Sequence, residues 1–313
     1  EISCSLVGSE MCIRDRYCYL SSLEQAVQAG EVDEAVIDDA VRRILRLKFR
    51  LGLFDDPYRY CDSERERTEI LSEHNRAAVR DIARKSIVLL ENRDAVLPLS
   101  DRYKSIAVVG PLADNPADML GSWCAQGDGN EAVGILQGIR QAVGNGVKIR
   151  YAKGCDVEGE DRSGFSEAVR AVKKSDVAIV CLGETRFMSG EAASRTRLSL
   201  PGVQRELLAR LEATGTPVVL LLTNGRPLVL DWEQKHISTI LECWQLGSEA
   251  GHAIADVLFG KYNPSGKLTL SFPHNEGQIP VYYNSKSTGR PYVPDEWYVT
   301  CLLYTSPSPR DCS

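Results

Sequence analysis

The sequence lacks the features that mark several large classes of protein. No apolar run in its 313 residues reaches the ~18 residues that a membrane-spanning helix needs. Acidic residues outnumber basic ones, 43 to 37, for a formal net charge of −6. This balance argues against nucleic acid as the main partner, because phosphate binding needs a basic face. There is also no CxxC pair or Cys/His cluster of the kind that holds a metal.

Several common catalytic motifs are missing as well. The nearest approach to a GxSxG nucleophile elbow is 247–251, where the serine stands one position early. No Walker loop occurs, and the glycines at 127, 129 and 134 have the wrong spacing for a dinucleotide fingerprint. The four histidines are scattered singly, which is typical of structural or solvated positions.

What the sequence does contain is typical of a soluble globular protein, with 43% hydrophobic and 26% charged residues. Cys181 and Cys243 lie inside apolar runs and are interpreted as buried thiols. Cysteine usage therefore does not fix the cellular compartment.

The two ends of the chain have an unusual relationship. Residues 301–311 can be encoded by a DNA string whose reverse complement, in another frame, encodes residues 6–15. That string resembles a transposase sequencing adapter, so we interpret 1–16 and 301–313 as adapter-derived and exclude them from reasoning about the fold. The alternative, a real repeat or a signal peptide, is disfavoured because 6–16 has no apolar core segment.

Two helices are predicted in the part of the remaining chain that precedes Ser105. Apolar residues at helical spacing indicate an amphipathic helix within 31–54, with Asp33 as N-cap and Gly52 as stop. Residues 55–62 have the composition of a linker, and a second helix is expected from Ser72 to about Arg84.

From Ser105 onward, short apolar runs alternate with helical stretches. Strands are expected at 106–109, 147–151, 177–182, 217–223, 239–243 and 268–272. Helices are expected near 135–143, 166–173, 201–213 and 249–258. This alternation predicts an α/β fold in which a mostly parallel sheet is sandwiched between helices. Ligands of such sheets bind beyond the carboxyl ends of the strands.

The two loops richest in functional residue types follow strands of this sheet. The loop 183–195 carries Glu184, Glu191 and Arg195. Glycosidic cleavage needs one carboxylic acid to protonate the leaving oxygen, a role that suits a glutamate on a strand-anchored loop. Taken alone, such a loop is more often a solvated polar segment than a catalytic one. In the loop 110–124, Trp123 could stack on a sugar ring or could simply be a packing residue.

Read together, eight segments resemble the family 3 glycoside hydrolases, near the bacterial periplasmic β-glucosidase branch. They are AVRRILRLKFRLGLFDDPY (40–58), ARKSIVLLEN (83–92), LPL (97–99), IAVVGPLAD (106–114), GSW (121–123), GETRFMSGEAASRTRLSLPGVQRELL (183–208), GSEAGHAIADVLFGKYNPSGKLTLSFP (247–273) and TGRPY (288–292). They occur in the family's order over nearly the whole of residues 17–300.

The resemblance implies a C-terminal fragment of a two-part enzyme. Residues 17–71 would be the end of an N-terminal barrel and a linker, and 72–284 the α/β sandwich domain. Residues 285–300 would lead to a missing fibronectin-like domain. The aspartate nucleophile belongs to the barrel, so the resemblance implies that it is absent from this chain.

The resemblance also implies roles for individual residues. The family's acid/base position falls on Glu191, with Glu184 as the second choice, and Arg195 and Trp123 are candidates for substrate binding. The mechanism would be retaining, with the two catalytic carboxyl groups about 5–5.5 Å apart in the assembled enzyme. The acid's pKa should be raised there.

The parent enzyme would remove terminal β-D-glucosyl or related residues from oligosaccharides or β-glucosides, without a metal or organic cofactor. The missing barrel would be its intramolecular partner, neither nucleic acid nor membrane is expected, and a periplasmic or secreted location is suspected. Three alternatives stay open: a non-catalytic carbohydrate-binding or structural half-domain, a parent specific for β-xylosides, and a doubly wound domain that binds an unrelated small molecule. The isolated chain is expected to be inactive, because it lacks the nucleophile.

Overall fold

The computed structural model describes residues 13–191 and 193–282, and for 13–20 the backbone alone. The predicted adapter segment 301–313, the predicted linker 285–300, most of the segment 1–16 and the TGRPY block lie outside these residues. The chain divides into two units, one up to Ile70 and one from Leu71 onward. None of the helices in the described ranges is long and apolar enough to cross a bilayer.

The first unit contains three helices, α1 (Ile13–Gln28), α2 (Glu34–Arg50) and α3 (Ser63–Glu69). Asp33 caps α2 as predicted, because its side chain accepts a hydrogen bond from the Ala35 backbone N–H. The helix ends before Gly52, which adopts a left-handed φ of 69°. No residue of α2 is buried, so its apolar stripe faces solvent.

The second unit is built on one six-stranded sheet with the order β1-β6-β5-β4-β2-β3. The strands are β1 (Val88–Asn92), β2 (Ser105–Val109), β3 (Lys148–Ala152), β4 (Val177–Gly183), β5 (Val218–Thr223) and β6 (Thr239–Glu242). All pairs are parallel except that of β1 with β6, which is antiparallel. The predicted mostly parallel sheet is confirmed.

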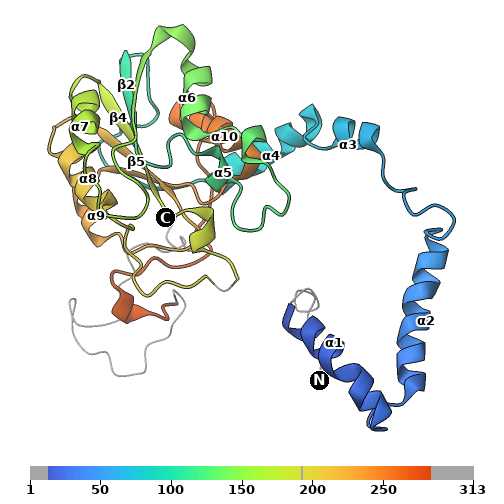
Figure 1. Ribbon diagram of the computed structural model, residues 1–313. Coiled ribbons are helices and arrows are strands. Elements are labelled where there is room, and N and C mark those ends of the chain that lie inside the picture. The colour runs from blue at the N-terminus through green and yellow to red at the C-terminus, as the bar shows by residue number, and fades with distance from the viewer. Residues whose placement is uncertain (1–12, 192, 283–313) are drawn as a thin grey trace, which may run out of the picture. The chain divides into compact units, whose positions relative to one another are not determined.

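Helices cover both faces of this sheet (Figure 1). On one face lie α4 (Glu73–Ser86), α6 (Ile135–Val143) and α10 (Ala250–Leu258), and on the other lie α7 (Phe165–Lys173), α8 (Gln204–Glu212) and α9 (Asp231–His236). The strand residues alternate between the two apolar cores, so that Ile179 and Cys181 face one and Val180 and Leu182 the other. Cys181 and Cys243 are buried free thiols, as predicted.

One predicted strand is wrong. Residues 268–272 form no strand and contribute only an isolated bridge at Phe272. The place beside β6 that a sixth parallel strand would take is filled by β1, which precedes the rest of the sheet in sequence. The segment 268–272 instead packs on the apolar core without joining the sheet: Phe272 is buried against Trp244, whereas Leu270 faces solvent.

Candidate active site

The candidate site lies at the carboxyl edge of the sheet, where the loops that follow β2, β4, β5 and β6 meet. Parallel strands place these loops side by side although they are far apart in the sequence. The loop that follows β4 contains the two candidate glutamates. It includes a short 3₁₀ turn, Arg186–Met188, before Gly190 and Glu191.

Glu184 lies at the base of this loop and is fully buried. One carboxylate oxygen pairs with the Arg195 guanidinium, and the other accepts from Nε of Arg226 at 3.2 Å. Its backbone N–H donates to the Thr223 carbonyl at 2.8 Å. Both oxygens of Glu184 are thus occupied, and its side chain does not reach the surface.

Glu191 has the opposite environment. It is exposed at the tip of the loop, and its carboxylate makes no hydrogen bond or ion pair with any residue that the structure describes. It follows Gly190, whose left-handed φ of 111° favours glycine. A Cβ on Gly190 would lie 3.0 Å from the Ser122 side chain and 3.9 Å from Nε1 of Trp123. The loop bearing Glu191 therefore packs beside the loop bearing Trp123.

Two aromatic rings stand out from this edge. Trp123 is 74% exposed and Phe187 is 75% exposed. The Arg186 guanidinium lies over the Phe187 ring, 4.8 Å from its centroid. Exposed rings beside a carboxylate can present an apolar face to the C–H groups of a sugar.

The tip of the loop is fixed from two sides. On one side, the buried Asp118, from α5 (Pro116–Met119), accepts from the Arg186 backbone N–H at 2.9 Å. On the other, Arg226 donates to the Met188 carbonyl, and the Ser189 side chain sits against Gly225, where a Cβ would clash with it. The short segment 186–190 is therefore held between the loops that follow β2 and β5.

A second buried carboxylate lies beneath these contacts. Glu242 ends β6 and accepts from the Trp244 backbone N–H at 2.9 Å and from Nδ2 of Asn224 at 3.2 Å. Asn224 also donates to the Arg226 carbonyl at 2.7 Å. Burial raises the pKa of Glu242 to about 8, and the nearby charge of Glu184 adds to this effect.

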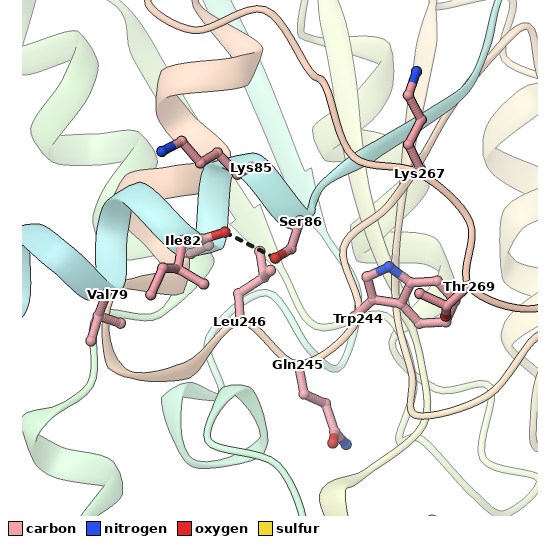
Figure 2. Close-up of a pocket in the computed structure, with 10 residues that line it drawn as sticks. Val79, Ile82, Lys85, Ser86, Trp244, Gln245, Leu246, Lys267 and Thr269 are labelled. Atoms are coloured by element: carbon pink, nitrogen blue, oxygen red, sulfur yellow. Dashed lines mark hydrogen bonds between the residues drawn. The ribbon is translucent and has the colours of Figure 1, made fainter. Parts of the chain in front are cut away.

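A hollow of about 510 Å³ lies between α4 and the segments that follow β6 (Figure 2). It is lined by Val79, Ile82, Ala83, Lys85, Ser86, Trp244, Gln245, Leu246, Lys267 and Thr269. Figure 2 shows Ser86 turned back onto its own helix, where its hydroxyl donates to the Ile82 carbonyl. No carboxylate is among the residues that line this hollow, so they do not include the carboxylic acid that glycosidic cleavage needs.

Comparison with known proteins places the chain in a family. Residues 87–304 match the sequence profile of the glycosyl hydrolase family 3 C-terminal domain. The chain belongs to glycosyl hydrolase family 3. It is similar to the periplasmic beta-glucosidase of Salmonella typhimurium (45% identical, covering 92% of this chain and 40% of that protein). It is also similar to a beta-xylosidase of Formosa agariphila (42% identical, covering 79% and 35%).

Solved structures agree with this family 3 assignment. The beta-glucosidase from Listeria innocua superposes with a TM-score of 0.80 at 36% identity, covering 92% of this chain and 40% of that one. The chain thus spans about two fifths of the length of these relatives. The resemblance predicted from the sequence blocks is confirmed at the level of the family and the fold.

The four residues predicted for the family 3 site are arranged in two pairs. Glu191 lies on the loop next to Trp123, and Arg195 pairs with Glu184 beneath it. Asp118, Arg226 and Glu242 were not predicted from the sequence. Asp118 and Arg226 follow apolar runs and Glu242 lies within one, and single polar residues at such positions are common in α/β proteins.

Proposed function

We propose that this chain is the part of a retaining β-glucosidase-type enzyme that supplies the acid/base, Glu191. The observation that carries the proposal is the contrast between the two glutamates of one loop. Glu191 is exposed and unpaired among the described residues, on a tip that is fixed from both sides. Glu184 is buried with both oxygens engaged, so a substrate could not reach it. Glu184 remains the second choice for the acid/base.

In the first chemical step, the protonated carboxyl of Glu191 gives its proton to the glycosidic oxygen while the C1–O bond breaks. An aspartate on the barrel, outside this chain, forms the new bond to C1. In the second step, water attacks C1, Glu191 takes the proton from that water, and the bond to the aspartate breaks. Trp123 would present its ring face to the sugar. Arg195 would mainly hold the loop through its ion pair with Glu184, and binding of substrate would be its lesser role.

The names of the relatives support a β-D-glucosyl substrate, because both the Salmonella and the Listeria proteins are called beta-glucosidases. The similarity to the Formosa beta-xylosidase favours a β-xyloside as the second candidate. The periplasmic Salmonella relative supports a periplasmic or secreted location. No cofactor is required by the proposed chemistry.

The proposal also includes the organisation of the chain. Residues 17–71 would close the N-terminal barrel and residues 72–284 would be the sandwich domain, which the division after Ile70 supports. The barrel would then be the intramolecular partner of this sandwich. The isolated chain would be inactive, since it lacks the nucleophile.

The test introduces Glu191→Ala into the full-length enzyme, which contains the barrel as well as this chain, and compares the variant with the unmodified enzyme. Removing a general acid costs about 10²–10⁴-fold, so kcat/KM should fall by that order for phenyl β-glucoside, whose leaving group needs a proton. It should change little for the 2,4-dinitrophenyl glycoside, and added azide should restore turnover as a β-glucosyl azide. Full activity of the variant on both substrates would contradict the role of Glu191. Turnover by the isolated chain that Glu191→Gln abolishes would contradict the two-part site.

A further inference from the structure

Glu184 is fully buried and pairs with two guanidinium groups, an arrangement that the proposed proton transfer does not use. Taking a carboxylate and two guanidiniums out of water is expensive unless the geometry repays it. Among the described residues, one further fully buried glutamate has an arginine partner: Glu233 pairs with Arg205 alone, at 2.8 Å and 3.2 Å. The second arginine on Glu184 therefore calls for an explanation.

Two of the three residues flank Glu191 in the sequence, and the third contacts the same loop from the loop that follows β5. Glu184 is the first residue after β4, at the start of the loop, and Arg195 lies four residues beyond Glu191. Arg226 comes from the loop after β5 and, besides pairing with Glu184, donates to the Met188 carbonyl. One buried carboxylate thus ties together the start of the loop, its far side and, through Arg226, its tip.

The base of this arrangement is itself held firmly. The Gln204 side chain accepts from the Gly183 N–H at 2.9 Å and donates to the Gly183 carbonyl at 2.8 Å, which fixes the residue before Glu184. Asn224 donates to the Arg226 carbonyl at 2.7 Å, which fixes the residue that holds Met188. The strands and helices below the loop are therefore rigidly connected to its tip.

We propose that Glu184, Arg195 and Arg226 form a positioning triad that orients Glu191 for proton transfer and does not touch the substrate. The inference rests on the proposed function, since it assigns these residues a role in the action of Glu191. A mobile acid spends less time within hydrogen-bond reach of the leaving oxygen, so a fixed loop raises the rate of the protonated step.

The triad also sets the local charge. With Glu184 ionised, its three groups sum to one positive charge, and neutralising Glu184 would leave two. Other charged residues on or beside the loop, namely Arg186, Arg197 and Asp118, are present in either case, while Glu242 is buried with a raised pKa. Extra positive charge favours the ionised form of a nearby acid. Loss of the Glu184 charge should therefore shift the alkaline limb of the kcat/KM profile to lower pH.

The experiment compares Glu184→Gln and Arg226→Lys with Glu233→Gln in the full-length enzyme. Glu233→Gln is the matched control, since it disrupts the pair between a fully buried glutamate on α9 and an arginine on α8, both outside the loop 183–195. For Glu184→Gln, kcat/KM on phenyl β-glucoside should fall by about ten- to a hundredfold, a part of the full general-acid effect. On the dinitrophenyl glycoside it should fall by less than about threefold, because protonation of that leaving group matters little.

Arg226→Lys keeps the charge but loses the planar fork that reaches two partners. Its kcat/KM should depend on the leaving group in the same way, but the alkaline limb of its pH profile should not shift. This variant still tests the proposal if Glu184→Gln does not fold. Equal losses on both substrates with an unmoved pH profile, or behaviour like Glu233→Gln, would overturn the proposal. Azide rescue of Glu184→Ala would also overturn it, because Glu184 would then be the acid itself. Failure of Glu191→Ala to lose activity would instead remove the proposed function.

Discussion

Glu242 shows how much the environment of a single carboxyl group can differ at one sheet edge. It ends β6 without an arginine partner among the described residues, and only the Trp244 N–H and Asn224 Nδ2 donate to it. In contrast, the buried charge of Glu184 is compensated directly by the guanidinium groups of Arg195 and Arg226. Burial raises the pKa of Glu242 to about 8, so the folded protein holds this carboxyl in its neutral form at neutral pH.

This difference predicts a pH dependence of stability. In the unfolded chain Glu242 ionises near its ordinary pKa of 4.5, while in the folded chain it keeps its proton to about pH 8. Between these values the folded state binds more protons, so the contribution of Glu242 to the free energy of unfolding falls as pH rises, by up to about 1.4 kcal/mol per pH unit. Glu242→Gln is neutral at every pH and removes this slope.

Thermal unfolding of the two proteins at pH 5 and pH 8 is the measurement. The Tm of Glu242→Gln relative to the parent sequence should be higher at pH 8 than at pH 5. A Tm difference that is the same at both pH values would mean that Glu242 does not carry a proton into the folded state. Comparing variant with parent cancels the other groups that titrate in this range.

At the residue scale, the sequence could predict the loop but not the relation between its two glutamates. Glu184 and Glu191 both follow an apolar strand within one Gly-containing loop, so composition treats them alike. What separates them is Arg226, which reaches Glu184 from 42 positions away in the sequence. Such a contact depends on which strands are neighbours, and β4 and β5 become neighbours only in the folded sheet.

At the scale of elements, α6 and α10 pack against each other at backbone contact. A Cβ on Gly138 would overlap the Gly251 carbonyl, and one on Gly251 would overlap the Gly134 carbonyl. The helices approach to backbone contact because neither has a side chain at the crossing. This contact fixes α10, whose Asp256 pairs with both nitrogens of the Arg80 fork on α4 at 2.6 Å and 2.7 Å.

Gly138→Ala should therefore force α6 and α10 apart. Overpacking of this kind costs about 1–3 kcal/mol, and here it opposes the higher helix propensity of alanine, which is worth about 1 kcal/mol. We expect a net loss of stability in denaturant unfolding. Gly146→Ala is the control, because its Cβ would meet no atom within 4 Å and should leave the midpoint nearly unchanged. Equal midpoints for both variants would show that the helices can separate freely.

Helices and strands with a regular spacing of apolar residues could be predicted from the sequence. An element whose formation depends on which of two apolar runs pairs with a given strand could not. The helices within 31–54 and near 135–143, and the five strands from 106 to 243, follow from apolar spacing alone. The run 268–272 alternates like a strand, yet β1 already occupies the edge beside β6. Sequence spacing cannot indicate which of two apolar runs pairs with a strand, since that depends on the connections around the whole sheet.

At the scale of the whole molecule, the apolar core formed by the described side chains belongs to the second unit. Both core clusters contain only residues between Ala83 and Phe272. In the first unit, α2 has no buried residue and exposes apolar side chains such as Ile44 and Phe49. Exposed apolar surface of this extent marks an interaction site or an aggregation risk. This is what the proposed barrel helix would show in the absence of its barrel.

Removing residues 1–70 should therefore leave the sandwich intact while reducing its tendency to aggregate. The chain that begins at Leu71 keeps α4, its N-cap Ser72 and its ion pairs with Glu249 and Asp256. We expect the truncated and complete chains to unfold at the same denaturant midpoint, because the unfolding core is the same. The truncated chain should bind less of a dye such as ANS and stay monomeric at higher concentration in light scattering. A lower midpoint after truncation would mean that residues 1–70 stabilise the sandwich, and the exposed stripe of α2 would then need a different explanation.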